Sequence, residues 1–180
     1  MSLKEATAEK HREAESTPFM KAVFNKSLPF SLWTDWTYQK WLFYKAIEMS
    51  AQKHGLLNNL PNIQRTLFLY DDYTEMNKDR FPYKFRPIVI EYYNYILSID
   101  SNPDKIMSHL YTWHMGDLFG GQMIKKLIDA PHKSLDFDNS TELKSLIREK
   151  LNDSMAEEAN IAFDWAIRMM RDYDNDLEQN

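Results

Sequence analysis

The chain has 180 residues, 43% of them hydrophobic, which suits a single compact domain with a sizeable core. A formal net charge of −5 gives no broad basic surface of the kind that binds a phosphate backbone, so we do not expect a nucleic-acid partner. Because cysteine is absent, disulfides and thiolate ligands are excluded, and histidine and carboxylates remain as candidate metal ligands. No apolar run approaches the length of a membrane span, so we expect a soluble, cytoplasmic protein with no membrane partner.

The first two helices are predicted from their capping signals. Ser2 and Glu5 have the spacing of a capping box, and the helix-forming residues that follow predict a helix over 3–15. Thr17 followed by Pro18 is typical of a helix start, with threonine as the N-cap and proline at the first helical position. This second helix should be short.

The middle of the chain alternates helices with polar stretches. Apolar residues recur at helical spacing over 31–54, and Gly55 follows where a glycine commonly ends a helix. A further helix is predicted over 62–70, a looser polar stretch over 71–83, and another helix from Pro87 to Ile96.

The C-terminal third predicts two more helical regions. Asn102 and Pro103 begin a helix that runs to about Ile128. Ser140 caps a last helical region that extends to about Tyr173 and is broken near 152–154. No strand signal appears, so the predicted fold class is all-α, a single-domain bundle of helices around a common core.

One face of the predicted first helix carries a chemically varied row of side chains. Lys4, Ala8, His11 and Glu15 are spaced by four, three and four residues, which places them above one another on a helix. A neutral imidazole is a good iron ligand, and a carboxylate one turn away can orient it. The alternative is an ordinary solvated helix face, because lysine and histidine are common on surfaces.

Three of the four glycines fall within six residues of the predicted helix over 103–128, at Gly116, Gly120 and Gly121. Each interior glycine costs a helix about 0.5–1 kcal/mol relative to alanine, so some benefit should compensate. We expect a kink and a bare backbone face that a flat ligand can approach, with Asp117 in a polar network beside it. The alternative is a tight helix crossing with Asp117 pointing to solvent.

Two segments resemble the heme oxygenase family. The first is LKEATAEKHREAE over 3–15, similar to the proximal helix, and the second is YTWHMGDLFGGQMIKK over 111–126, similar to the kinked distal helix with its GDxxGGQ core. Weaker similarity covers the rest, so residues 1–180 are expected to form one heme oxygenase domain with heme between these two helices.

The resemblance implies a set of binding residues. His11 would be the axial ligand of heme iron, with Glu15 one turn later. The heme propionates would be held by three cations, Lys4, Lys144 and Arg148. The pocket would be lined by Tyr44, Tyr111, Gly121 and Phe163.

The resemblance also implies the reaction. Heme b is both substrate and prosthetic group, and it is cut with O2 to biliverdin, expected as the IXα isomer, with release of CO and ferrous iron. Asp117 would order distal waters that deliver a proton, while the close backbone at Gly116 and Gly120 directs oxygen toward the ring edge. Heme catabolism of this kind serves bilin biosynthesis, so a bilin reductase is the expected downstream partner.

Electrons must come from outside, because no flavin, nicotinamide or iron–sulfur motif is present. We expect an acidic one-electron donor such as reduced ferredoxin, docked on Arg12, Lys125 and Lys126. The sequence departs from the family pattern at Ala8, where some relatives have lysine, at Trp113, where an arginine often stands, and at Phe119, where serine is common.

Two other functions would explain parts of this pattern. A non-catalytic heme carrier or sensor would keep His11 but would need neither Asp117 nor the glycine cluster. A carboxylate-bridged di-metal protein would need repeated Glu-x-x-His pairs, and the sequence contains none. The remaining histidines are expected to be surface or core residues without a site; these are His54, His109, His114 and His132.

Overall fold

A computed structural model describes all residues, 1–180, as an all-helical bundle without strands, which confirms the predicted fold class. The helices in chain order are α1 (Leu3–Ala6), α2 (Ala8–Glu15), α3 (Pro18–Phe24), α4 (Phe30–Lys53), α5 (Thr66–Met76), α6 (Pro87–Ser98), α7 (Pro103–Leu127), α8 (Ser140–Glu149), α9 (Ala156–Arg171) and α10 (Asp174–Glu178), with short 3-10 turns η1 (Lys133–Leu135) and η2 (Asp153–Met155).

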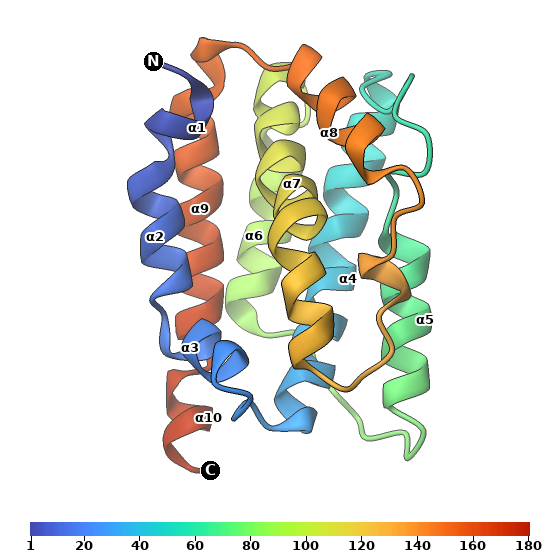
Figure 1. Cartoon of the computed structure of the whole chain (residues 1–180), viewed down its shortest axis with the longest axis vertical. Helices are drawn as coiled ribbons and strands as arrows, with labels where there is room; N and C mark the ends of the chain where they lie inside the picture. The colour runs from blue at the N-terminus through green and yellow to red at the C-terminus, as the bar shows by residue number, and fades with distance from the viewer.

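The long helices α4, α6, α7 and α9 run along a shared axis, with α2 packed beside α9 on one side and α5 beside α4 on the other (Figure 1). The inner faces of the long helices, together with residues of α1, α3 and α8, form one contiguous core cluster of 28 buried residues. Aromatic rings dominate its centre, where Phe43 and Trp113 lie 4.6 Å apart and Phe19 and Tyr173 lie 4.9 Å apart. Most of the aromatic content therefore serves packing. No helix is both long enough and apolar enough to span a bilayer.

Local capping signals set the ends of several helices where the sequence predicts. The Thr17 hydroxyl accepts the Met20 N–H at the start of α3, and the Asn102 side chain accepts the Lys105 N–H at the start of α7. Gly55 adopts a φ of +69° just past α4, in the left-handed region that favours glycine.

Three predicted helix boundaries were wrong. The helix over 3–15 is divided at Thr7, whose hydroxyl donates to the Leu3 carbonyl at 2.9 Å and competes with regular helix geometry. Backbone bonds from Thr7 to Leu3 and from His11 to Thr7 still cross the division. At the start of α8, Ser140 is the first helical residue and Asn139 holds the capping position.

The predicted helix over 62–70 is displaced toward the C-terminus, so part of the predicted polar stretch over 71–83 is helical. Glu48 of α4 sets the start, because its carboxylate accepts the backbone N–H groups of Arg65 and Thr66. Asp72 keeps the helix going beyond Tyr70, since its buried carboxylate accepts two N–H groups of η1. Both causes are tertiary contacts.

Candidate functional site

His11 lies on α2 with its side chain 56% exposed, and no buried group holds its ring. Its Nε2 is 3.5 Å from a carboxylate oxygen of Glu15, as the four-residue spacing predicts, which is a loose contact between two exposed side chains. One edge of the imidazole meets the ring of Phe163 on α9 at 5.8 Å. The imidazole is therefore accessible to a ligand that covers this side of α2.

Side-chain contacts fasten the segment that carries His11 to α9. Lys10 forms an ion pair with Asp164 at 2.7 Å, and the Asn160 amide donates to the carbonyl of Ala6 at 3.1 Å. Because Lys10 and His11 are neighbours on α2, these contacts set the position of the imidazole relative to α9. Since α7 also packs on α9, one helix serves as the common support for both candidate site helices.

The glycines of α7 divide into two kinds. Gly116 and Gly120 are exposed, and a Cβ built on either one would meet no atom within 4 Å. Gly121 is buried, and its Cβ would lie 2.9 Å from Cδ2 of Leu135. The helix runs unbroken through all three. Gly116 and Gly120 thus form the bare backbone surface that the sequence predicts, whereas Gly121 admits the close approach of Leu135.

Asp117 is buried between α7 and α4, with its side chain 11% exposed. One oxygen pairs with the ammonium of Lys40 at 3.0 Å, and the other accepts the hydroxyl of Tyr44 at 2.5 Å. Burial, reinforced by the nearby carboxylate of Asp117, raises the pKa of Tyr44 well above its usual range, so this hydroxyl keeps its proton and remains a donor.

The predicted polar network around Asp117 is therefore built directly from side chains of α4. Tyr44 was identified from the sequence as a pocket residue, but Lys40 was not. Lys40 and Tyr44 are one helical turn apart, so both reach the same turn of α7. The signal that could have identified Lys40 is its place among the apolar residues of a core helix, where an unpaired lysine is rare.

The three cations predicted to bind propionates remain available for an anion. Neither Lys4, Lys144 nor Arg148 forms an ion pair within 4.0 Å. Lys144 and Arg148 instead lie over the ring of Phe119, at 4.0 and 5.7 Å from its centroid. Phe119 is half-exposed on the same turn as Gly116 and Gly120. Cationic charge and bare backbone therefore share one surface.

Tyr111 links this surface to the helix of His11. Burial is the main cause that raises the pKa of Tyr111, and the nearby Thr7 side chain together with the charge of Arg148 opposes the rise. Thr7 is the residue that separates α1 from α2, and Arg148 belongs to α8. Tyr111 thus lies where the three segments predicted to carry binding residues approach one another.

The remaining predicted residues lie outside this surface. Trp113 is buried, and its indole donates to the Tyr92 hydroxyl at 2.9 Å, away from Asp117. His114 and His109 are fully buried against Glu48 and Glu158, at 2.9 and 3.0 Å. His54 and His132 bind nearby oxygens of Asp100 and Asp136. No group of three or more His, Asp or Glu side chains could hold a metal ion.

The donor set fits a planar, anionic metal chelate. One accessible imidazole can supply a single axial ligand, two side-chain-free glycines allow a flat ring to approach the backbone, and free cations lie near the same surface. Heme has this combination of metal, plane and carboxylate edge.

Comparison with known proteins identifies the family from the sequence and a shared fold from the structure. The family model described as heme oxygenase matches residues 1–146. Heme oxygenase 2 of Macaca fascicularis is 25% identical over 207 residues, covering 96% of this chain and 64% of the relative. Heme oxygenase 1 of Synechocystis sp. is 24% identical over 205 residues, covering 99% of this chain and 84% of the relative.

The chain thus spans less than two thirds of the length of the macaque relative. Among solved structures, heme oxygenase-1 from Synechocystis sp. in complex with heme superposes with a TM-score of 0.86 at 21% identity, covering 98% of this chain and 92% of that one. The helical fold is shared at this level of similarity. Because the family model matches most of the sequence, the chain belongs to the heme oxygenase family.

Proposed function

We propose that this protein binds heme between α2 and α7 and cleaves it oxidatively to biliverdin, with release of CO and ferrous iron. The expected isomer is biliverdin IXα. The observation that carries the proposal is the pairing of an accessible imidazole at His11 with the bare backbone of Gly116 and Gly120. Both are carried by helices packed on α9. In the proposal, residues 1–180 act as one heme oxygenase domain.

His11 would hold the heme iron, and Glu15 would orient the imidazole by accepting a hydrogen bond from the ring nitrogen that does not bind iron. In the structure Nε2 is the nitrogen nearer Glu15, so iron binding through Nε2 requires the ring to turn about its exposed side-chain bonds. Phe163 would pack against the imidazole edge. When bound, heme supplies the iron at which O2 is reduced, and the ring that is cut.

Asp117 would hold the proton-donating water on the distal side. Its carboxylate is fixed by two partners, and its side chain keeps an exposed fraction of 11%. A carboxylate held in this way can order a water through which a proton reaches the site, without itself contacting the iron. Gly116 and Gly120 would let the ring lie against backbone, which leaves little room for other water.

The cations would set the rotation of heme about its own axis. Lys144 and Arg148 lie over Phe119, so propionates bound there would place the opposite ring edge toward the interior of the site. Lys4 and Tyr111 would add to this edge. The rotation decides which meso carbon is cut.

The electron donor in the proposal is a reduced ferredoxin or an equivalent acidic one-electron carrier, and a bilin reductase is the proposed consumer of the product. Arg12 and Lys126 are exposed and free of ion pairs, so they fit an acidic partner. Lys125 already pairs with Asp136 at 3.0 Å and is the weaker docking residue.

The test is a hemin titration followed by turnover. Hemin should produce a Soret band with a saturating one-to-one titration, and adding reductant under oxygen should replace that band by the biliverdin spectrum. His11→Ala should abolish the histidine-ligated spectrum. His54→Ala, which removes a histidine at the far end of α4, is the matched control and should leave the spectrum intact. A Soret band that persists through turnover would instead assign the chain to non-catalytic heme carriage.

Asp117→Asn separates binding from chemistry. It should bind hemin with the wild-type spectrum but form biliverdin at least about a hundredfold more slowly, the usual contribution of a positioned proton donor. Wild-type turnover in this variant would remove Asp117 from the mechanism.

A further inference from the structure

Lys40 is a lysine in a place where packing alone would favour an apolar residue. It lies in the middle of α4 with 8% of its surface exposed, one turn before the fully buried Tyr44. Lysine is almost never buried to this extent unless it is paired, because removing an ammonium from water carries a large desolvation penalty. A methionine would fill the same space without that penalty, so the charge itself requires an explanation.

The charge of Lys40 is directed at Asp117. Its Nζ lies 3.0 Å from Oδ1 of Asp117, and the two side chains are 10% and 11% exposed. Asp117 forms no other ion pair within 4.0 Å, so Lys40 is the only cation that contacts it. The Tyr44 hydroxyl occupies the second oxygen. The carboxylate is therefore held at both oxygens by two successive turns of one helix.

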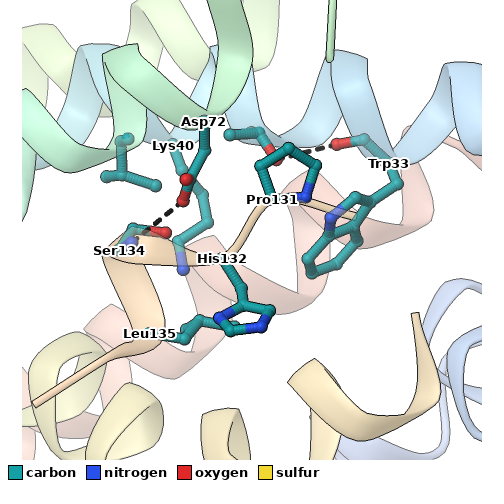
Figure 2. Close-up of a pocket in the computed structure, with 9 residues that line it drawn as sticks. Trp33, Lys40, Asp72, Pro131, His132, Ser134 and Leu135 are labelled. Atoms are coloured by element: carbon teal, nitrogen blue, oxygen red, sulfur yellow. Dashed lines mark hydrogen bonds between the residues drawn. The ribbon is translucent and has the colours of Figure 1, made fainter. Parts of the chain in front are cut away.

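A small cavity lies on the other side of the Lys40 side chain. It has a volume of about 10 Å³ and lies between α4, α5 and η1, where Asp72, Ser134 and Leu135 line it together with Lys40. Figure 2 shows the Lys40 side chain extending past Asp72 and Ser134. About this much space accommodates one water molecule. An ammonium has three protons, so Lys40 can donate to Asp117 and still be hydrated from this side.

We infer that Lys40 is a positioning residue that holds Asp117 in the orientation needed for proton delivery at the heme site. This inference rests on the proposed function. The ammonium fixes one oxygen of Asp117 and the tyrosine fixes the other, so the carboxylate keeps one orientation in which to order a water. Without the ammonium, one carboxylate oxygen loses its partner, and the side chain can turn away from this orientation.

The experiment compares Lys40→Met, Lys40→Arg, Asp117→Asn and the double variant Lys40→Met/Asp117→Asn. Lys45→Met is the matched control, because Lys45 is an exposed lysine on the same helix. Each variant is measured for hemin affinity and Soret spectrum, for biliverdin formed in a single turnover with a chemical reductant, and, without heme, for its unfolding temperature.

Lys40→Met should bind hemin within about twofold of wild type but form biliverdin at least about tenfold more slowly, and Lys40→Arg should recover most of that loss. The double variant should be no slower than Asp117→Asn alone, because the lysine acts only through the aspartate. Without heme, Lys40→Met should unfold about 10 °C lower than wild type, and the double variant should recover much of that stability.

A wild-type rate of biliverdin formation in Lys40→Met overturns the inference. So does a double variant that is slower than Asp117→Asn by the factor that Lys40→Met alone loses. If Lys40→Met does not fold, the comparison between Asp117→Asn and the double variant, together with Lys40→Arg, decides the same question. If the wild-type chain binds hemin but leaves it uncleaved, the proposed function fails and the inference falls with it. If wild type cleaves hemin and Lys40→Met forms biliverdin at the wild-type rate, the proposed function stands and the inference alone is rejected.

Discussion

The two sides of α7 treat charged groups in opposite ways. Toward the core, Asp117 is paired with Lys40 and His114 is paired with Glu48, all nearly inaccessible to solvent. On the exposed side, around Gly116 and Gly120, the cations Lys144 and Arg148 meet an aromatic ring rather than carboxylates. Polar pairing inside the bundle therefore stabilises the helices, whereas the charge left unpaired outside is available to a ligand.

The paired side should be most sensitive at Glu48, which joins α4, α5 and α7. Its carboxylate accepts bonds from His114 and from the backbone at the start of α5, and it is 3% exposed. Glu48→Gln removes the charge that these donors share, so we expect the free energy of unfolding to fall by about 3 kcal/mol. Urea unfolding monitored by circular dichroism measures this loss.

Glu75→Gln is the control for the Glu48 variant, because Glu75 is exposed on α5 without an ion pair. Its unfolding should change by less than about 0.5 kcal/mol. A loss in Glu48→Gln no larger than that of the control would show that the buried pairing is not a main source of stability.

The free energy of unfolding should decline in two steps as the pH falls, the first due to buried His109 and the second to buried Glu48. Burial lowers the pKa of His109 below its ordinary value of 6.5, although the hydrogen bond to Glu158 opposes this. The unfolded chain then binds more protons than the folded one once the pH falls below about 6.5, so stability declines from there. The free energy of unfolding should drop by about 1 kcal/mol or more between pH 7.5 and 5.5.

A second decline should begin near pH 4.5. Burial would raise the pKa of Glu48, but hydrogen bonds from His114, Thr66 and Arg65 outweigh it and leave the pKa below its ordinary 4.5. Stability from a lowered carboxyl pKa is present above 4.5 and is lost as the pH falls through the folded value. His109→Gln should weaken the first decline only, and equal declines in both proteins would contradict this assignment.

The glycines of α7 lie on both of its sides, Gly120 on the exposed side and Gly121 on the buried side. Gly120→Ala adds a Cβ into open space, so it should stabilise the heme-free protein by about 0.5–1 kcal/mol. Gly121→Ala brings its Cβ within 2.9 Å of Leu135, so the gain in helix propensity should be offset by repacking.

Hemin affinity should show the opposite order from stability in these variants. Gly120→Ala should weaken hemin binding, because the new methyl group occupies the surface that the ring would approach. Gly121→Ala should bind hemin more nearly as wild type does. Thermal unfolding and hemin titration of both variants give the two rankings, and an unchanged hemin affinity in Gly120→Ala would place the ring elsewhere.

The smallest expected effects come from the two surface cations, Lys144, which is half-buried, and Arg148, which is exposed. Lys144→Met and Arg148→Met should each weaken hemin binding by about threefold to fivefold, as expected for charge contacts near the surface, and the loss should shrink at high salt. Since neither residue forms an ion pair in the heme-free protein, unfolding should change by less than about 0.5 kcal/mol. Hemin titrations at two salt concentrations test this, and an affinity loss independent of salt would argue against a charge contact.

Local signals predicted much of the fold because they act within a few residues. Thr17 and Asn102 cap helices through their own neighbours, and Gly55 follows α4 in a conformation that its lack of a side chain permits. The start of α5 was misplaced for the opposite reason, since the carboxylate that caps it belongs to Glu48, 17 residues earlier. The sequence pattern at 62–70 carries no trace of that contact.

The candidate site divides in the same way. His11 and Glu15 are four residues apart on one helix, so their contact follows from helix geometry, and the exposed glycines of α7 follow from their clustering. Lys40 is 77 residues from Asp117, and nothing local marks the two as partners. Tyr44 was identified only as a pocket residue, and its hydrogen bond to Asp117 emerged from the packing of α4 on α7.

From the sequence we could predict an all-helical chain, the positions of its long helices, and the two segments whose side chains suit an iron chelate, because capping and helical periodicity depend on near neighbours. The tertiary structure decided which groups are paired and which are free: it buried Asp117 against Lys40, turned Trp113 into the core and left Lys144 beside Phe119. Burial and ion pairing depend on how helices distant in sequence pack together, and no local pattern specifies that arrangement.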